Sequence, residues 1–198
     1  FSLRQKGSNA IEAFVIVANL VTQDNGKSIV KGNERVLNAR LSDAKFFWEN
    51  DLRVIETNGY ESLAEKLKEV TFHNELGNEF NRVNRIATIA HEISGMLGAD
   101  QKSTSLAASL CKLDLVSEMV YEFPELQGVI GKYYAQRAGF SKSISDACYE
   151  HYLPRGPLDM VPRNPVSVAL ALADKIDLIS SFWAINLKPS GSKDPFAL

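Results

Sequence analysis

Apolar residues recur at intervals of three or four along most of this chain of 198 residues. One stripe of this kind consists of Leu76, Phe80, Val83, Ile86, Ala90, Ile93 and Leu97. Such spacing places the apolar side chains on one face of an α-helix. The same pattern predicts helices at about 33–52, 61–70, 75–97, 103–123, 125–137, 141–152 and 165–179. The chain is therefore predicted to be mostly α-helical.

Residues of known helix-end preference mark several of these boundaries. Asn33 is a plausible N-cap of the first helix, and Gly98 suits the C-cap of the helix over 75–97. Ser103 and Thr104 can cap the next helix. Pro165 after Asn164 predicts the start of the final helix, because proline fits the first helical position.

The first thirty residues have a different character. The β-branched run at 14–18 predicts a short buried strand, and Asp24-Asn25-Gly26-Lys27 is typical of a turn. We therefore predict two parts: residues 1–31 as the end of a truncated α/β domain, and residues 32–198 as a helical domain. The ends Phe1-Ser2-Leu3 and Phe196-Ala197-Leu198 suggest an internal fragment of a longer protein.

Charge and composition narrow the classes of function. The chain has 22 basic and 24 acidic residues, so any contact with RNA must use a local patch rather than a global basic field. No apolar run is long enough to span a membrane, and Cys111 and Cys148 are typical of reduced core residues. We expect a cytoplasmic protein with no membrane partner.

The segment from Ala171 to Asp177, Ala-Leu-Ala-Asp-Lys-Ile-Asp, resembles the final aspartate motif of the HD phosphohydrolase superfamily. Two further segments, 122–128 and 150–154, resemble other motifs of that superfamily in the same order. The resemblance covers roughly Gly77 to Ser181 and implies an HD-like helical domain.

The metal ligands of that superfamily are mostly replaced. The early histidine position falls near Arg82, Asn84 or Arg85, and Cys111-Lys112-Leu113-Asp114 stands where His-Asp is expected. A lysine repels a metal cation at short range. We predict a lost metal centre, with no metal and no catalytic residue in this chain. Its degenerate positions are Asp114, His151 and Asp174, and the aspartates are expected to pair with Lys112, Lys175 or Arg85.

Longer segments carry a more specific resemblance. Gly-Asn-Glu-Arg-Val-Leu-Asn-Ala-Arg-Leu-Ser-Asp-Ala-Lys-Phe-Phe at 32–47 is similar to a segment of the bacterial glycyl-tRNA synthetase beta subunit, as are 113–128, 150–154 and 191–198. The resemblance implies part of a heterotetrameric glycine–tRNA ligase that supports tRNA(Gly) recognition and charging. It implies the alpha subunit and the remainder of the beta subunit as partners. The alpha subunit would carry the adenylation site with ATP and Mg²⁺, so no cofactor is expected in this fragment.

Contacts with tRNA would use basic side chains for phosphates and aromatic side chains for bases. The adjacent Tyr133 and Tyr134 could stack on bases, but one of such a pair usually faces the core. The candidate tRNA-contact residues are Arg35, Arg40, Lys45, Arg82, Arg85, Lys132, Arg137 and Lys142.

Two alternative functions remain open at this stage. One is a residual metal-dependent HD phosphohydrolase acting on nucleotides or a phosphodiester, with Asp114, His151 and Asp174 at its centre. The other is a scaffold for subunit assembly without RNA contact, which would present an apolar surface patch.

Overall fold

The computed structural model describes residues 1–7, 10–190 and 194. The chain forms two compact units, Phe1–Lys45 and Phe46–Leu198, which are described separately. The predicted boundary at residues 31 and 32 lies inside helix α1 (Lys27–Asn58), whereas the units divide at 45 and 46. The assignment of residues 1–31 to a larger α/β domain stays a prediction. The similar segment at 191–198 lies outside the described residues, apart from Asp194.

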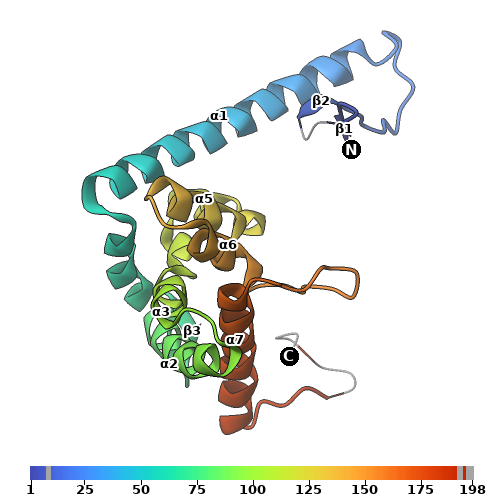
Figure 1. Cartoon of the computed structure of the whole chain (residues 1–198). Coiled ribbons are helices and arrows are strands. Elements are labelled where there is room, and N and C mark those ends of the chain that lie inside the picture. The colour runs from blue at the N-terminus through green and yellow to red at the C-terminus, as the bar shows by residue number, and fades with distance from the viewer. Residues whose placement is uncertain (8–9, 191–193, 195–198) are drawn as a thin grey trace. The chain divides into compact units, whose positions relative to one another are not determined.

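The first unit contains a two-stranded antiparallel hairpin and the beginning of α1 (Figure 1). Strand β1 (Ser2–Arg4) pairs with β2 (Ile11–Phe14), with Ser2 opposite Phe14. The predicted buried strand at 14–18 is wrong: β2 ends at Phe14, and Val17 is 84% exposed. A β-branched run favours extended structure, but burial needs a second layer. None of the described residues of this unit is buried.

Helix α1 starts earlier than the sequence indicates. The predicted turn is confirmed, because residues 23–26 form it, and the Asp24 carboxylate accepts hydrogen bonds from the backbone N–H groups of Gly26 at 3.2 Å and Ser28 at 2.8 Å. The helix therefore begins at Lys27, and the predicted N-cap Asn33 is wrong. Asn33 lies within the first two turns, where its side-chain amide donates to the Ile29 carbonyl at 2.9 Å. The carboxylate of Asp24, nine residues before Asn33, accepts from the free N–H groups at the helix start instead.

The second unit is a packed set of helices, so the prediction of a mostly α protein is confirmed. In Figure 1, α2 (Glu79–Leu97) lies beside α7 (Pro165–Ala184) and α3 (Gln101–Leu110), and α5 (Val129–Arg137) packs on α6 (Lys142–Glu150). Shorter elements are η1 (Tyr60–Glu69), β3 (Thr71–His73), β4 (Gly77–Asn78), η2 (Leu113–Val116), α4 (Glu118–Glu122) and η3 (Pro124–Leu126). The HD-superfamily assignment of this helical unit stays a prediction.

Two predicted helix ends in this unit are confirmed. Gly98 has a φ of 63° and closes α2 with its backbone N–H bonded to the Ser94 carbonyl. The Asn164 side chain accepts from the Val166 N–H at 3.0 Å, and Pro165 occupies the first turn of α7. Among the described residues, no helix combines the length and apolar character that a bilayer crossing requires.

The predicted helix over 103–123 is wrong as a single element. The structure breaks it into α3, η2 and α4, and the N-cap of α3 is Asp100 rather than Ser103 or Thr104. Helix α4 starts after Ser117, whose hydroxyl accepts from the Val120 N–H at 3.2 Å. Asp51 of α1, a residue distant in sequence, stabilises this break. Its carboxylate accepts from the N–H groups of Glu118 and Met119 at 3.0 and 2.9 Å.

Other element boundaries shift by smaller amounts. The predicted helix over 61–70 is a 3-10 helix, Tyr60–Glu69, and α2 begins at Glu79 because β3 and β4 occupy part of 71–78. The predicted helices over 125–137 and 141–152 appear as α5 and α6, each shorter than expected.

Replacing Tyr134 with phenylalanine is expected to lower the free energy of unfolding by about 1 kcal/mol. The Tyr134 hydroxyl is buried and donates to Asp51 Oδ2 at 2.7 Å. Removing the hydroxyl takes one hydrogen bond from the Asp51 carboxylate, which also accepts from the first N–H groups of α4. Urea denaturation measures the change, and Tyr133→Phe is the matched control because Tyr133 is 51% exposed on the same helix. Equal effects of the two substitutions would contradict this assignment.

Candidate functional site

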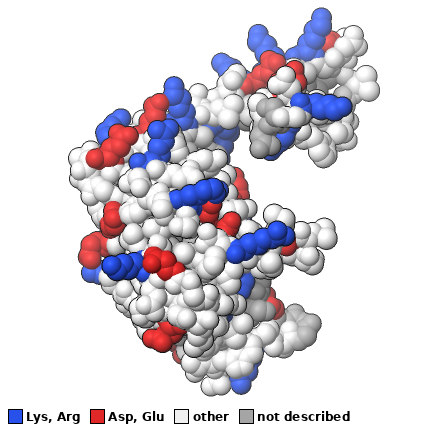
Figure 2. Space-filling model, in the orientation of Figure 1, with Lys and Arg blue, Asp and Glu red and all other residues white. Residues whose placement is uncertain are grey.

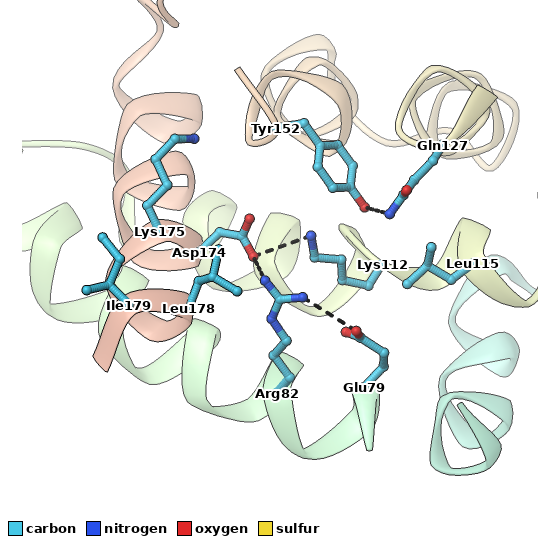
Figure 3. A pocket seen from close by; sticks show the side chains of 10 residues that line it. All are labelled: Glu79, Arg82, Lys112, Leu115, Gln127, Tyr152, Asp174, Lys175, Leu178 and Ile179. Atoms are coloured by element: carbon cyan, nitrogen blue, oxygen red, sulfur yellow. Dashed lines mark hydrogen bonds and ion pairs between the residues drawn. The ribbon is translucent and has the colours of Figure 1, made fainter. Parts of the chain in front are cut away.

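The positions predicted to be a lost metal centre meet in the second unit. Asp174 comes from α7, Asp114 from η2, and His151 directly follows α6. Lys112 directly precedes η2, and Arg82 lies on α2 beside α7. Figure 3 shows Asp174, Lys112 and Arg82 pointing toward one another from these separate elements. The fold therefore brings Asp174, Lys112 and Arg82 into one cluster, and their origin in a metal centre stays a prediction.

Asp174 is held by two buried cations. Its Oδ1 atom lies 2.9 Å from Arg82 Nη2 and 3.3 Å from Lys112 Nζ (Figure 3). Burial raises the pKa of this carboxyl, but Lys112, His151 and Arg82 outweigh burial and bring the pKa down to about 2. Asp174 is therefore ionised at neutral pH and paired. The predicted pairing with Lys112 is confirmed, and Arg82 is a partner that the sequence reasoning missed.

Arg82 connects three carboxylates. Besides Asp174, its Nη1 lies 3.4 Å from Glu79 Oε1 and its Nε lies 3.5 Å from Asp177 Oδ2. Its guanidinium also lies 4.3 Å from the centre of the Phe72 ring. Although burial lowers the pKa of Arg82, the surrounding carboxylates raise it overall. Arg82 is one of the three residues, with Asn84 and Arg85, near which the resemblance placed an early histidine ligand, and that placement stays a prediction.

Asp177 extends the network to a second arginine. Arg85 Nε donates to Asp177 Oδ1 at 2.6 Å, and Arg85 Nη2 donates to Asp177 Oδ2 at 3.2 Å. This bidentate geometry is the strong form of a guanidinium–carboxylate contact. The expected pairing of Arg85 with Asp174 or Asp114 is therefore not what the structure shows, because Asp177 holds it.

Asp114 is fully buried and is not ion-paired in the way expected. Its Oδ2 atom accepts from the Gly128 N–H at 2.6 Å, while Oδ1 has no hydrogen-bond partner among the described residues. Burial raises the pKa of Asp114 to about 6, although the Gly128 N–H and the Lys112 charge act in the opposite direction. A fully buried carboxyl with a raised pKa and one oxygen held by a backbone N–H resembles a core residue more than a metal ligand.

The side chains of His151 and Lys175 contact backbone carbonyl oxygens. The Nδ1 atom of His151 lies 3.1 Å from the Ala147 carbonyl, and burial together with Lys112 lowers the pKa of His151 well below its usual value. Lys175 Nζ donates to the carbonyls of His151 and Leu153 at 3.3 and 2.9 Å. The expected pairing of Lys175 with an aspartate is replaced by this contact at the end of α6.

A cavity of about 450 Å³ adjoins the cluster. Five polar or charged side chains of its lining are Glu79, Arg82, Lys112, Asp174 and Lys175. Its apolar wall is formed by Leu115, Leu178 and Ile179. Tyr152 and Gln127 complete it, with Gln127 Nε2 donating to the Tyr152 hydroxyl at 2.6 Å (Figure 3). The arrangement can bind a small molecule, but it offers no nucleophile with an adjacent base.

The residues present do not fit a divalent metal. Cation ligands in such a site would be carboxylates and imidazoles, yet Asp174 Oδ1 is already shared by Arg82 and Lys112. A metal ion beside these two cations would be repelled. Among the described residues, no cluster of three His, Cys, Asp or Glu side chains has a geometry that could hold a metal ion. The arrangement therefore does not favour the alternative of a metal-dependent phosphohydrolase.

The candidate tRNA-contact residues separate into two groups. Arg82 is buried and Arg85 is held by Asp177, while Lys132 and Lys142 both contact Asp146. The exposed candidates are Arg35, Arg40 and Lys45 on α1, Arg137 at the end of α5, and Lys142 at the start of α6, whose side chain is 84% exposed. Figure 2 shows basic and acidic side chains interspersed on the face in view. A phosphate backbone can therefore reach these five candidates.

Glu79 and Asp177 are site residues that the sequence analysis did not select. A signal for them exists, because Arg82 and Arg85 stand three residues apart on one apolar helix, as Asp174 and Asp177 do on another. Two such pairs of opposite charge predict that the helices pack with these faces together. Tyr152 and Gln127 have no comparable signal.

Comparison with known proteins gives one consistent result. The family model described as "Glycyl-tRNA synthetase beta subunit" matches residues 1–198. The glycine–tRNA ligase beta subunit of Ruegeria sp. (strain TM1040) is 56% identical over 199 residues, covering 100% of this chain and 29% of that protein. The corresponding subunit of Rhodospirillum centenum is 47% identical over 201 residues, covering 100% of this chain and 28% of that protein. The chain thus spans less than a third of these relatives.

Proposed function

Because the chain belongs to the glycyl-tRNA synthetase beta subunit family, we propose that it is part of a glycine–tRNA ligase and supports the recognition and aminoacylation of tRNA(Gly). The observation that carries this proposal is the family match over all 198 residues. The reaction of the complete enzyme joins glycine to tRNA at the expense of ATP, with AMP and diphosphate as products.

The chain acts in this proposal as a binding and positioning module. The adenylation site, with its ATP and Mg²⁺, lies on the alpha subunit, and two subunits of each kind form a cytoplasmic heterotetramer. The HD-like helical unit has no hydrolase activity of its own. The internal pairing of Asp174 with Arg82 and Lys112 supports this part, because it ties up the carboxylate that a metal centre would need.

The exposed basic residues of α1 are the preferred tRNA contact. Arg35, Arg40 and Lys45 lie on an exposed stretch of helix, and their spacing of five residues directs them to different sides of it. Lys and Arg side chains provide most phosphate contacts in complexes with nucleic acids. Their contribution would be electrostatic and sensitive to salt rather than specific for sequence.

The variant carrying Arg35→Gln, Arg40→Gln and Lys45→Gln is expected to raise the KM for tRNA(Gly) by about tenfold, while kcat changes little. Loss of three phosphate contacts weakens binding before the chemical step and reduces the salt dependence of the KM. Steady-state aminoacylation by the complete enzyme, measured at several salt concentrations, provides both quantities.

A matched control neutralises Lys66 and Lys102, which are exposed on the helical unit and are not among the candidates. These substitutions should leave the KM for tRNA unchanged within about twofold. An unaltered KM and salt dependence in the α1 variant would reject this contact. Unchanged charging by an enzyme that lacks residues 1–198 altogether would reject the proposed function itself.

A further inference from the structure

Helix α7 has the reverse of the polarity that a surface helix normally shows. Asp174 and Asp177 are buried, in the ion pairs with Arg82 and Arg85. The structure describes every residue of α7, and none of its charged side chains is exposed. Its large exposed side chains are instead apolar: Leu172, Ile176, Ile179 and Trp183. Helices at a protein surface normally bury their apolar face and expose the charged one.

These four exposed residues form one continuous line, which we call the α7 stripe. Each of them is between 41% and 46% exposed. They follow one another at intervals of four, three and four residues, which places them on one narrow face of the helix. At a rise of 1.5 Å per residue the stripe is about 16 Å long. In Figure 1, α7 lies at the edge of the helical unit, and it packs on α2, α3 and α6.

The polar neighbours of the stripe make hydrogen bonds to the chain's own backbone. Lys175 is partly buried, and its ammonium donates to the carbonyl oxygens of His151 and Leu153. The Ser180 hydroxyl donates to the Ile176 carbonyl oxygen at 2.6 Å. The stripe is therefore an apolar surface that no neighbouring side chain of α7 covers with charge.

The apolar surface continues from the stripe into the cavity beside Asp174. Ile179 belongs to the stripe and also lines this cavity, together with Leu115 and Leu178 (Figure 3). Removing a large apolar side chain from water is the main source of affinity when a helix packs on such a surface. A partner that lies along α7 thus has a recess of about 450 Å³ for an anchoring side chain.

The spacing of the stripe indicates the kind of partner that fits it. Apolar residues at alternating intervals of three and four form the contact line between two packed α-helices, where the side chains of each helix enter the gaps of the other. A strand would present side chains at intervals of two and would match this line poorly. The stripe therefore fits an amphipathic helix of about three turns.

The composition of the stripe indicates that this partner is permanent. Interfaces that form and separate keep about as much polar surface as the rest of a protein, whereas permanent ones resemble a hydrophobic core. The chain covers only 29% of the Ruegeria relative and 28% of the Rhodospirillum relative, so more than two thirds of each lies outside it. A segment of the same polypeptide is always present and at high effective concentration.

We propose that, in the complete beta subunit, the α7 stripe is covered by an amphipathic helix from the part of the same polypeptide outside these 198 residues. The helix packs its own apolar line between Leu172 and Trp183 and inserts one large side chain beside Ile179. The inference rests on membership of the family and on the surface of α7, and it does not depend on the proposed contact with tRNA.

A photocrosslinking probe identifies the segment that covers the stripe. Trp183→p-benzoylphenylalanine keeps a large aromatic side chain on the stripe and is introduced into the complete two-subunit enzyme. After irradiation and proteolysis, mass spectrometry is expected to find residue 183 joined to a beta-subunit peptide from outside the 198 residues. The same probe at Lys102, an exposed charged position on α3, should not give this product.

The other products of this experiment would overturn the proposal. These are a crosslink to the alpha subunit, a crosslink to a peptide within the 198 residues, and a crosslink to a second copy of the beta subunit. Mixing isotope-labelled and unlabelled beta subunits distinguishes the second copy from the same chain. The absence of any crosslink at position 183 would also overturn it.

The variant Ile176→Cys measures how completely the stripe is covered. Cys111 and Cys148 are fully buried, so the introduced thiol is the accessible one within this chain. Its alkylation by iodoacetamide, located by peptide mass spectrometry, is expected to be at least about tenfold slower in the folded beta subunit than in urea. The same slowing is expected with and without the alpha subunit. Lys102→Cys is the matched control and should be slowed less than about threefold.

Slowing no greater than that of Lys102→Cys, or slowing only when the alpha subunit is present, would overturn the proposal. The proposed function fails by a different result. A beta subunit whose stripe is covered but which is not needed for charging of tRNA(Gly) would retain this inference and reject the proposed function.

Discussion

Replacing Asp174 with alanine is expected to lower the free energy of unfolding by about 3–5 kcal/mol, because it leaves two buried cations without their shared partner. Asp174 is the only ion-pair partner of Lys112 among the described residues, and it also contacts Arg82 at 2.9 Å. Arg82 retains Glu79 and Asp177, so most of the loss falls on Lys112. Urea denaturation at neutral pH measures the change.

Two comparisons separate charge from packing. Asp174→Asn keeps an acceptor oxygen of similar shape and removes only the charge, so its effect is expected to be large but smaller than that of alanine. Glu65→Ala removes one side of the exposed pair with Lys68 and should cost less than about 1 kcal/mol. If Asp174→Ala destabilised the chain no more than Glu65→Ala, the ion-pair cluster would not be a stabilising element of this fold.

Replacing Asp114 with asparagine is expected to stabilise the chain at pH 7–8 by about 3 kcal/mol and to have little effect near pH 3.5. Burial raises the pKa of Asp114 from 3.8 to about 6 in the folded state. Below pH 3.8 the Asp114 carboxyl is protonated in both the folded and the unfolded state. Between pH 3.8 and pH 6 the unfolded state loses it first, so stability falls as the pH rises. Above pH 6 both states are ionised and the penalty is constant.

The difference in unfolding free energy between Asp114→Asn and the unmodified chain, measured at half-unit steps of pH, isolates this one group. Asp146→Asn is the control of opposite sign, since Lys132 and Lys142 overcome the effect of burial and lower the pKa of Asp146. That variant should be a little less stable than the unmodified chain above pH 4, and this deficit should shrink as the pH falls below 3.8. A difference for Asp114→Asn that did not grow between pH 4 and pH 6 would show that burial does not raise the pKa of this carboxyl.

The helices of the second unit are predictable from sequence where nearby residues determine their positions and ends. The apolar stripe of α2, the C-cap glycine at Gly98 and the Asn164–Pro165 start of α7 are all local, and all are confirmed. The start of α1 was predicted too late, at Asn33, because the competing cap Asp24 belongs to a turn that was interpreted separately. The buried strand predicted at 14–18 was wrong because a β-branched run does not indicate whether a second layer covers it.

The break between α3 and α4 depends on a distant residue. Asp51 on α1 supplies the acceptor for the N–H groups of Glu118 and Met119, which lie more than sixty positions away. A sequence pattern read over a window of one helix does not contain this partner. The apolar spacing through Met119 therefore continued to predict one helix where tertiary contacts stabilise two.

The sequence by itself determined the helical class, most helix positions and the family, because these follow from local periodicity and from long segments of matching residues. It also led to the prediction, still untested, that Asp174 belongs to an altered metal centre. Only the tertiary structure decided the partners of that residue: Arg82 and Lys112 rather than Arg85 or Lys175. Ion-pair partners depend on how helices rotate about their axes when they pack, and that rotation follows from the whole core rather than from any one segment.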